Sequence, residues 1–187
     1  MTKNDRAIDG RQVRSTTILA VRRDGMLAIA GDGQVSIGDT VFKHKAVKLR
    51  RMYNDKVVAG YAGAAADALT LFERLESKLD EYSGNLQRAS LELVKQWRTD
   101  KALRQLQALL VVGDANSLLL VSGTGDLLVP DGDVIGIGSG GGYAQAAATA
   151  LIEHTDMPAD EVAREAVTIA SRICVFTNDT ITVEVLQ

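Results

Sequence analysis

The segment from Gly136 to Gly142 carries the residue pattern most suggestive of ligand binding. Gly136, Gly138 and Gly141 satisfy G-x-G-x-x-G, whose glycines let a backbone approach a dinucleotide pyrophosphate. A dinucleotide site also needs an acidic residue at the end of the next strand, whereas two helical patterns follow this segment. We therefore interpret the segment as a structural turn and keep a dinucleotide-dependent enzyme as an alternative.

Conventional nucleophiles and metal ligands are sparse in this chain. Ser139 lies between glycines, but Ile137 occupies the first glycine position of a G-x-S-x-G nucleophile elbow. His44 and His154 are the only histidines and stand in polar stretches, which predicts surface positions. One cysteine, Cys174, and two separated histidines form no zinc-binding pattern. No Gly-Lys pair occurs, so no Walker A loop exists and we expect no ATP hydrolysis by this chain.

Composition narrows the class of protein further. The 187 residues carry a net charge of -3, which offers no overall attraction for nucleic acid. No apolar run approaches the roughly 18 to 20 residues of a membrane helix, and residues 1–15 lack a signal-peptide core. The single cysteine suits a reducing compartment. We expect a cytoplasmic protein with one domain, no membrane contact and no nucleic-acid partner.

A run of basic residues precedes and enters one predicted strand. Strand alternation predicts that Lys48 and Arg50 point to one side and Arg51 to the other, and Lys43 and Lys45 precede them. This is typical of a solvated edge rather than of a nucleic-acid site, at least for most of these residues.

The first part of the chain reads as a meander of antiparallel strands. Apolar and β-branched residues begin at Thr16, and Asp24-Gly25 is a hairpin signal before a second apolar run at 26–30. Further strand-like stretches lie at 35–42, 48–53 and 56–62. Apolar residues at helical spacing then predict an amphipathic helix that ends near Gly84, formed by Leu69, Phe72, Leu75, Leu79 and Tyr82. A second helix follows directly, with an apolar face of Leu86, Leu93, Val94 and Trp97.

The second part returns to strands and then to helices. Short apolar runs lie at 109–112, 118–121, 127–129 and 134–137. An alanine-rich helix is predicted over 143–154, another from Pro158 to about 173, and a last strand over 180–185. This order predicts an α+β fold in which two stacked antiparallel sheets lie between helical layers, a four-layer αββα sandwich.

Several motifs together resemble the HslV (ClpQ) family of proteolytic subunits, which belongs to the N-terminal nucleophile hydrolases. The resemblance runs from Thr16 to the C-terminus and includes TTILAVRR at 16–23, GDGQ at 31–34, KLRR at 48–51, AGYAG at 59–63, DALTLFE at 67–73, QWRTD at 96–100, IGSGG at 137–141 and ICVFTN at 173–178. The αββα sandwich of that family matches the layer order predicted above.

The resemblance implies that Thr16 is the nucleophile of a threonine endopeptidase. A hydroxyl needs a neighbouring base, and the free α-amine of the same residue has an unperturbed pKa of about 7.7 to 8.0, which suits general-base catalysis. Within an uncut chain that nitrogen is an amide and cannot accept a proton. We therefore predict that residues 1–15 are a propeptide removed on maturation and that 16–187 form the peptidase domain.

The remaining site residues follow from the same resemblance. Lys48 is expected to favour the deprotonated Thr16 hydroxyl, and Asp32 to orient Lys48. Gly60 corresponds to an oxyanion-hole glycine, and Ser139 to a serine that hydrogen-bonds near the threonine amine. A sodium ion is implied at three backbone carbonyls, those of Ser171, Cys174 and Thr177, with Ser171 in place of the family's glycine. Cys174 is then structural.

Partners are also implied by the resemblance. Family members stack as two six-membered rings around a chamber, and a hexameric HslU (ClpY) ATPase unfolds protein substrates and threads them in. The propeptide is longer than in many members, and residues 44–47 differ from the family pattern. The alternative from another class is a catalytically silent ring subunit that acts as a scaffold, although Thr16, Asp32, Lys48 and Ser139 are all retained.

Overall fold

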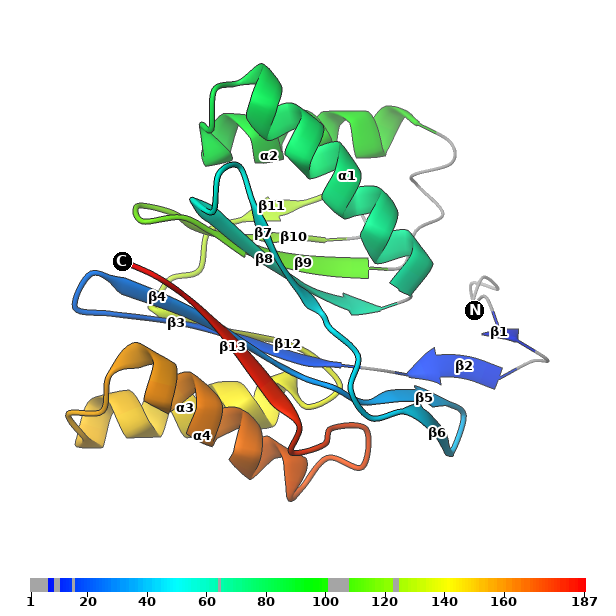
Figure 1. Ribbon diagram of the computed structural model, residues 1–187, viewed down its shortest axis with the longest axis vertical. Coiled ribbons are helices and arrows are strands. Elements are labelled where there is room, and N and C mark those ends of the chain that lie inside the picture. Colours follow the sequence, from blue (N-terminus) through cyan, green and yellow to red (C-terminus); the bar gives the residue numbers. More distant parts are fainter. Residues whose placement is uncertain (1–6, 9–10, 15, 64, 101–107, 123–124) are drawn as a thin grey trace.

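Two antiparallel sheets stack face to face, and a pair of helices covers the outer side of each (Figure 1). The computed structural model describes residues 7–8, 11–14, 16–63, 65–100, 108–122 and 125–187. Its strands are β1 (Ala7–Ile8), β2 (Arg11–Arg14), β3 (Thr17–Arg23), β4 (Met26–Asp32), β5 (Val35–Ile37), β6 (Thr40–Lys43), β7 (Leu49–Met52), β8 (Val57–Gly63), β9 (Ala108–Gly113), β10 (Leu118–Val121), β11 (Leu127–Leu128), β12 (Val134–Gly138) and β13 (Ile181–Leu186). Its helices are α1 (Ala65–Glu81), α2 (Leu86–Thr99), α3 (Gly141–His154) and α4 (Ala159–Ser171).

The strands of the described chain form three sheets, two of them stacked. The first has the order β12-β3-β4-β13 and lies beside α3 and α4, and the second has the order β11-β10-β9-β8-β7 and lies beside α1 and α2. A small third sheet, β1-β2-β5-β6, extends from one end of the sandwich. The predicted αββα sandwich is confirmed.

Strand alternation explains how one strand contributes to two cores. In β3, Ile18 and Ala20 pack between the two stacked sheets, whereas Leu19 and Val21 pack against α3 and α4. All four side chains are fully buried, so this strand is apolar without interruption. A fully buried central strand holds the residue before it, Thr16, in a fixed place.

The two helical layers are packed with different residues. The core under α1 and α2 contains large side chains such as Phe72, Leu75 and Trp97, whereas α3 and α4 contribute mainly alanine, for example Ala148 and Ala166. The expected apolar stripe of α1 is wrong at Leu69, which is 56% exposed. The buried face of α1 instead runs through Ala68, Leu71, Phe72, Leu75 and Leu79. Alanine occurs at both buried and exposed helix positions, so the spacing of apolar residues did not show that the buried face begins at Ala68.

Other boundaries differ modestly from those expected. The single strand expected over 35–42 is a hairpin of β5 and β6 that turns at Gly38, where φ is +57°. α4 ends at Ser171 rather than near 173. The sequence predicted no strands before Thr16, yet β2 pairs with β5, with Arg14 opposite Ser36. Ser15 lies outside the described residues.

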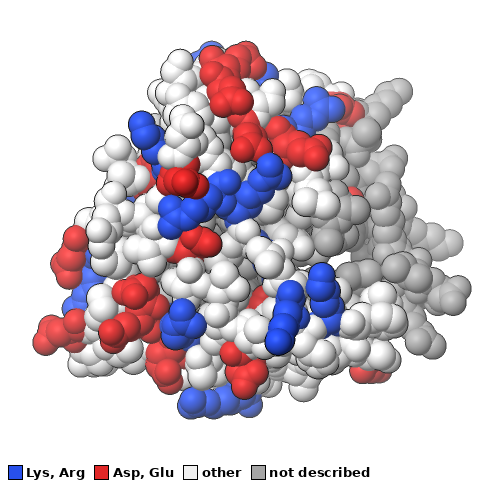
Figure 2. All heavy atoms as spheres, viewed as in Figure 1, with Lys and Arg blue, Asp and Glu red and all other residues white. Residues whose placement is uncertain are grey.

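The surface of the described residues carries charged side chains of both signs. Both histidines, His44 and His154, are exposed as predicted. Basic and acidic side chains are interspersed over the described part of the face shown in Figure 2. Among the described helices, none has the length and apolar character needed to cross a membrane. No group of three or more His, Cys, Asp or Glu side chains that could hold a metal ion occurs in the described part of the chain.

Candidate active site

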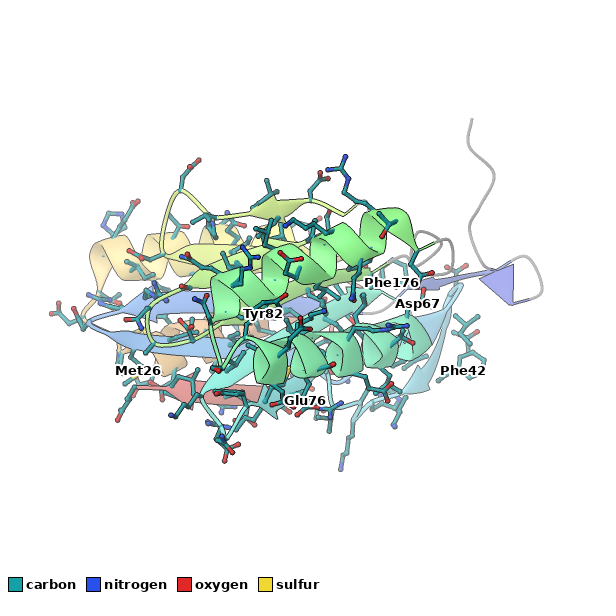
Figure 3. The ribbon with its side chains drawn as sticks, turned by 90° about the horizontal axis from the view of Figure 1, so that it is seen from above. Met26, Phe42, Asp67, Glu76, Tyr82 and Phe176 are labelled. Carbon is teal, nitrogen blue, oxygen red and sulfur yellow. The ribbon has the colours of Figure 1, made fainter. Side chains whose placement is uncertain are left out.

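Thr16 stands at the head of β3, in the middle of the first sheet. β3 pairs with β12 on one side, with Thr17 opposite Gly138, and with β4 on the other, with Ile18 opposite Gly31. The next residues along the two neighbouring strands, Ser139 and Asp32, therefore reach the same end of the sheet as Thr16. Figure 3 places Phe42, Asp67 and Phe176 at this end of the sandwich, where β2 leaves it, and Met26 at the opposite end.

Asp32 is the centre of a buried hydrogen-bond network. Its Oδ1 atom accepts the backbone N–H of Thr17 at 2.7 Å and a proton of Lys48 Nζ at 2.8 Å. Its Oδ2 atom accepts the backbone N–H groups of Gln34 at 2.9 Å and Asn178 at 3.3 Å. With four donors on two oxygens, the carboxylate is held in one orientation beside the head of β3.

Lys48 forms a buried ion pair with Asp32. The side chains of Lys48 and Asp32 are 1% and 0% exposed, and Nζ also donates to the carbonyl of Gln34 at 2.6 Å. Burial lowers the pKa of Lys48 from its ordinary 10.5, and the adjacent carboxylate of Asp32 opposes that shift. The expectation that Lys48 and Arg50 share a side is wrong, because Lys48 precedes β7 and turns to the other sheet, while Arg50 pairs with Glu76 of α1.

The turn after β12 closes on the backbone of Thr16. The Ser139 N–H donates to the Thr16 carbonyl at 2.9 Å. A Cβ atom on Gly138 would lie 2.0 Å from that same carbonyl oxygen, and Gly138 has φ of +86°. Only glycine meets both conditions, so this residue fixes the approach of the turn to Thr16. Ser139 itself is exposed beside the site.

Thr16 has an unusual backbone conformation. The φ angle of Thr16 is +105°, although positive φ is strongly unfavourable for a β-branched residue. The residue is also fully buried. Such a conformation costs on the order of 1 to 3 kcal/mol and persists only where the surroundings impose it. The peptide group that follows Thr16 is held on both sides, because its carbonyl accepts the Ser139 N–H and the Thr17 N–H donates to Asp32.

Gly60 lies within β8, between β7 and β9. It is opposite Leu49 of β7 and Val111 of β9. A Cβ atom there would lie 2.7 Å from Ile18 of the facing sheet and 3.0 Å from Leu49. Close packing of the two sheets therefore accounts for a glycine at this position, and its oxyanion role stays a prediction.

Two threonine hydroxyls form a second contact at the head of β3. Thr17 Oγ1 and Thr177 Oγ1 are 2.7 Å apart, and both side chains are buried. Gly140 allows this pair, because a Cβ atom there would lie 2.2 Å from the Thr17 hydroxyl. The sequence did not single out the side chains of Thr17, Thr177, Gln34 or Asn178, since small polar residues in turns are common and give no distinctive signal.

The three residues expected to hold sodium follow one another at the end of α4. Ser171 is the last residue of that helix and Cys174 N–H donates to the Ala170 carbonyl at 2.8 Å. Thr177 N–H donates to the Cys174 carbonyl at 3.1 Å. Ser171 has ordinary helical backbone, so the position does not require the glycine of the family pattern. Carbonyl oxygens at a helix C-terminus are chemically suited to a hard cation, and the sodium role of these residues stays a prediction.

The glycine-rich segment has a structural role, as predicted. A Cβ atom on Gly136 would lie 2.2 Å from the Gly141 carbonyl oxygen, and the Gly136 N–H donates to Gln145 Oε1 at 3.0 Å. β12 pairs with β3 in antiparallel fashion, unlike the parallel strands of a dinucleotide-binding βαβ unit. The structure therefore gives no support to the dinucleotide alternative.

Comparison with known proteins identifies the family. The sequence model of the family described as proteasome subunit matches residues 13–186. The "ATP-dependent protease subunit HslV" of Caldanaerobacter subterraneus subsp. tengcongensis is 57% identical over 174 residues, covering 92% of this chain and 99% of that protein. This chain belongs to the HslV branch of the proteasome family. The HslV of Syntrophobacter fumaroxidans is 55% identical over 174 residues, covering 93% and 97% of the two chains. The resemblance stated from sequence motifs is thus confirmed, and membership of the HslV branch makes the chain a peptidase.

Solved structures of the family agree with the fold. The crystal structure of HslV from Trypanosoma brucei has a TM-score of 0.86 and 47% identity, covering 91% of this chain and 99% of that chain. The Thiobacillus denitrificans protein called BPH, solved in complex with epoxomicin, has a TM-score of 0.71 at 21% identity and covers 91% and 98% of the two chains. That more distant likeness concerns the fold alone.

Proposed function

We propose that this HslV-family chain is the proteolytic subunit of an ATP-dependent protease and that Thr16 is its nucleophile. The observation that carries the proposal is the buried Lys48–Asp32 ion pair beside the head of β3, with Nζ and Oδ1 2.8 Å apart. A buried charged pair is costly to desolvate and is seldom retained for stability alone. Beside a threonine at the start of a strand, it supplies a fixed positive charge where an alkoxide would develop.

In the proposed reaction, the free α-amine of Thr16 takes the hydroxyl proton as Oγ1 attacks a substrate carbonyl carbon. The C–N bond then breaks, the amine returns the proton to the leaving nitrogen, and an ester links the substrate to Thr16. Water hydrolyses the ester by the same proton transfers. Lys48 stabilises the negative charge on Oγ1, and Asp32 holds the Lys48 ammonium in place.

Ser139 and Gly60 have supporting roles in this proposal. Ser139 holds the Thr16 carbonyl through its N–H, which places its exposed side chain beside the residue whose amine becomes free once the chain is cut. By the resemblance Gly60 supplies the oxyanion-hole N–H, and loss of such a donor costs about 3 to 4 kcal/mol in other enzymes. Its place in the sheet between β7 and β9 does not by itself direct that N–H toward Thr16.

Removal of residues 1–15 is the proposed activation step. While Thr16 is preceded by a peptide bond, its nitrogen cannot act as a base. The positive φ of Thr16 supports cleavage at this point, because cutting the Ser15–Thr16 bond removes the restriction on that torsion. In addition, β2 of the propeptide occupies the edge of β5 next to the site.

A sodium ion held by the carbonyls of Ser171, Cys174 and Thr177 is also proposed. When bound, it supplies a fixed positive charge that neutralises the end of α4. Two of these residues, Cys174 and Thr177, stabilise the segment after α4 through the Ala170–Cys174 and Cys174–Thr177 backbone hydrogen bonds, and Thr177 in turn contacts Thr17.

The proposed setting is a cytoplasmic double ring of six plus six subunits that receives unfolded proteins from an HslU-like ATPase hexamer. The names of the HslV relatives, which describe ATP-dependent protease subunits, support an ATPase partner. Enclosure has a physical reason, since an exposed threonine protease would attack loose segments of neighbouring proteins.

Covalent labelling tests the proposed nucleophile and separates it from a silent scaffold subunit. Mature protein treated with a peptide vinyl sulfone or epoxyketone is expected to carry one adduct at Thr16, found by peptide mass spectrometry. Thr16→Ala is expected to fold and assemble, to lose all labelling and to lose at least about 10³-fold in peptidase activity. N-terminal sequencing should show that the active chain begins at Thr16. An active preparation that still carries residues 1–15, or a Thr16→Ala variant with substantial activity, would contradict the proposal.

A further inference from the structure

The segment between α4 and β13, residues 172–180, crosses the end of the sheet that carries Thr16. Besides the Thr177 contact with Thr17, the Val175 carbonyl accepts a hydrogen bond from Gln34 Nε2 at 2.9 Å. The Asn178 N–H donates to Asp32 Oδ2 at 3.3 Å. This connecting segment therefore touches the residues that surround the nucleophile from a distant part of the sequence.

Asn178 uses both ends of its side-chain amide to join two other segments. Its Oδ1 atom accepts the N–H groups of Gly33 at 3.0 Å and Thr180 at 3.2 Å. Its Nδ2 atom donates to the His44 carbonyl at 2.9 Å. Gly33 is the neighbour of Asp32, and His44 lies in the connection that leads to Lys48.

The two joined segments are in close contact with each other. The Ala46 N–H donates to the Gly33 carbonyl at 2.9 Å. A Cβ atom on Gly33 would lie 2.3 Å from the His44 carbonyl oxygen, the same atom to which Asn178 donates. The spacing between the chain near Asp32 and the chain near Lys48 is therefore fixed by Gly33, Ala46 and Asn178 together.

We infer that Asn178 is a positioning residue for the Asp32–Lys48 pair. Asp32 ends β4 of one sheet and Lys48 directly precedes β7 of the other, so their relative position depends on contacts between those segments. Asn178 provides such contacts on both sides and holds Asp32 directly through its backbone. It touches no reacting atom, so its effect passes through Asp32 and Lys48. The inference rests on the proposed threonine mechanism.

Three substitutions at Asn178 separate positioning from local turn formation. Asn178→Ala removes all the side-chain hydrogen bonds. Asn178→Ser keeps a short oxygen that can accept the Thr180 N–H but cannot span to Gly33 and His44. Asn178→Asp has the same shape and keeps the oxygen facing Gly33 and Thr180, but replaces the donor to His44 with an acceptor. The matched control is Asn85→Ala, which removes the N-cap of α2, where Asn85 Oδ1 accepts the Arg88 N–H at 3.0 Å.

The test measures kcat and KM for a fluorogenic peptide, the rate of Thr16 labelling by a peptide vinyl sulfone, and the Tm, all on mature assembled protein. Asn178→Ala and Asn178→Ser are expected to lower kcat and the labelling rate on the order of 10- to 100-fold while KM stays within about twofold. Asn178→Asp is expected to show a smaller loss of the same kind. Asn85→Ala is expected to lower the Tm and leave kcat and labelling unchanged.

Each outcome decides between positioning and a structural role. Wild-type kcat in Asn178→Ser would show that Asn178 only forms the local turn and would overturn the inference. So would wild-type kcat in Asn178→Asp, which remains informative if Asn178→Ala does not fold. A loss of activity in Asn85→Ala equal to that in Asn178→Ala would attribute both to stability and would also overturn it. If the wild-type protein is active but not labelled at Thr16, the proposed function fails instead.

Discussion

Two ion pairs from one short stretch of chain lie in opposite environments. The Lys48–Asp32 pair has side chains that are 1% and 0% exposed, whereas in the Arg50–Glu76 pair, two residues further on, they are 38% and 35% exposed. Their N···O distances are nearly equal, 2.8 and 2.7 Å. Distance therefore does not distinguish them, but burial does, because desolvated charges interact strongly and tolerate the loss of a partner poorly.

Removing Lys48 is expected to have the largest effect. Lys48→Met should lower the rate of Thr16 labelling and the peptidase activity by at least about 10³-fold, because no positive charge remains to stabilise the negative charge on Thr16 Oγ1. It should also lower the free energy of unfolding by about 3 to 5 kcal/mol, because Asp32 is left as an unpaired buried charge. Urea denaturation and peptide hydrolysis measure the two effects.

A double variant sharpens this prediction. Lys48→Met combined with Asp32→Asn removes both charges but keeps an oxygen for the Thr17 N–H. Much of the stability should return while activity stays absent. Recovery of activity in the double variant would contradict the role given to Lys48.

The pH dependence of activity is expected to reflect the buried pair. kcat/KM should rise as the Thr16 amine loses its proton, near the unperturbed value of about 7.7 to 8.0. It should fall again as Lys48 loses its proton, and because burial lowers the pKa of Lys48, that fall should begin below 10.5. The unfolded chain binds the Lys48 proton more tightly, so the contribution of Lys48 to the free energy of unfolding should increase with pH between its folded pKa and 10.5. Activity that stays constant through pH 10.5 would contradict this assignment.

The exposed pair is expected to matter least. Arg50→Ala should lower the free energy of unfolding by only about 0.2 to 1 kcal/mol, since both side chains are partly solvated. The loss should shrink in high salt, and Thr16 labelling should be unchanged. A loss as large as that for Lys48→Met, measured by urea denaturation, would remove the distinction between the two pairs.

The layer order was predictable because most elements carry a strong period or turn signal. The continuous apolar run of β3, the Asp24-Gly25 hairpin and the end of α1 near Gly84, whose N–H donates to the Leu79 carbonyl, all follow from local residue types. The exposure of Leu69 was not predictable, because the buried residue beside it, Ala68, is an alanine, which does not mark a helix face as buried.

The site was predictable only through the combined motifs. A lysine among basic residues, such as Lys48, has no local feature that marks it as buried, because its partner Asp32 is brought to it by a different sheet. Asn178 carried no signal of its own, since asparagine is common in turns and its contacts with Gly33 and His44 are long-range. Such contacts depend on how distant segments meet in the folded chain, and local sequence patterns do not show which residues will meet.

The contact between Thr17 and Thr177 joins residues separated by 160 positions, and Asn178 reaches Gly33 across 145. During synthesis, the ribosome releases the head of β3 long before it releases the segment that fastens it. A nascent or prematurely terminated chain therefore carries a threonine whose surroundings are incomplete. The surroundings of Thr16 are therefore completed only after residues 177 and 178 have been synthesised and have packed against the head of β3 and the chain beside Asp32.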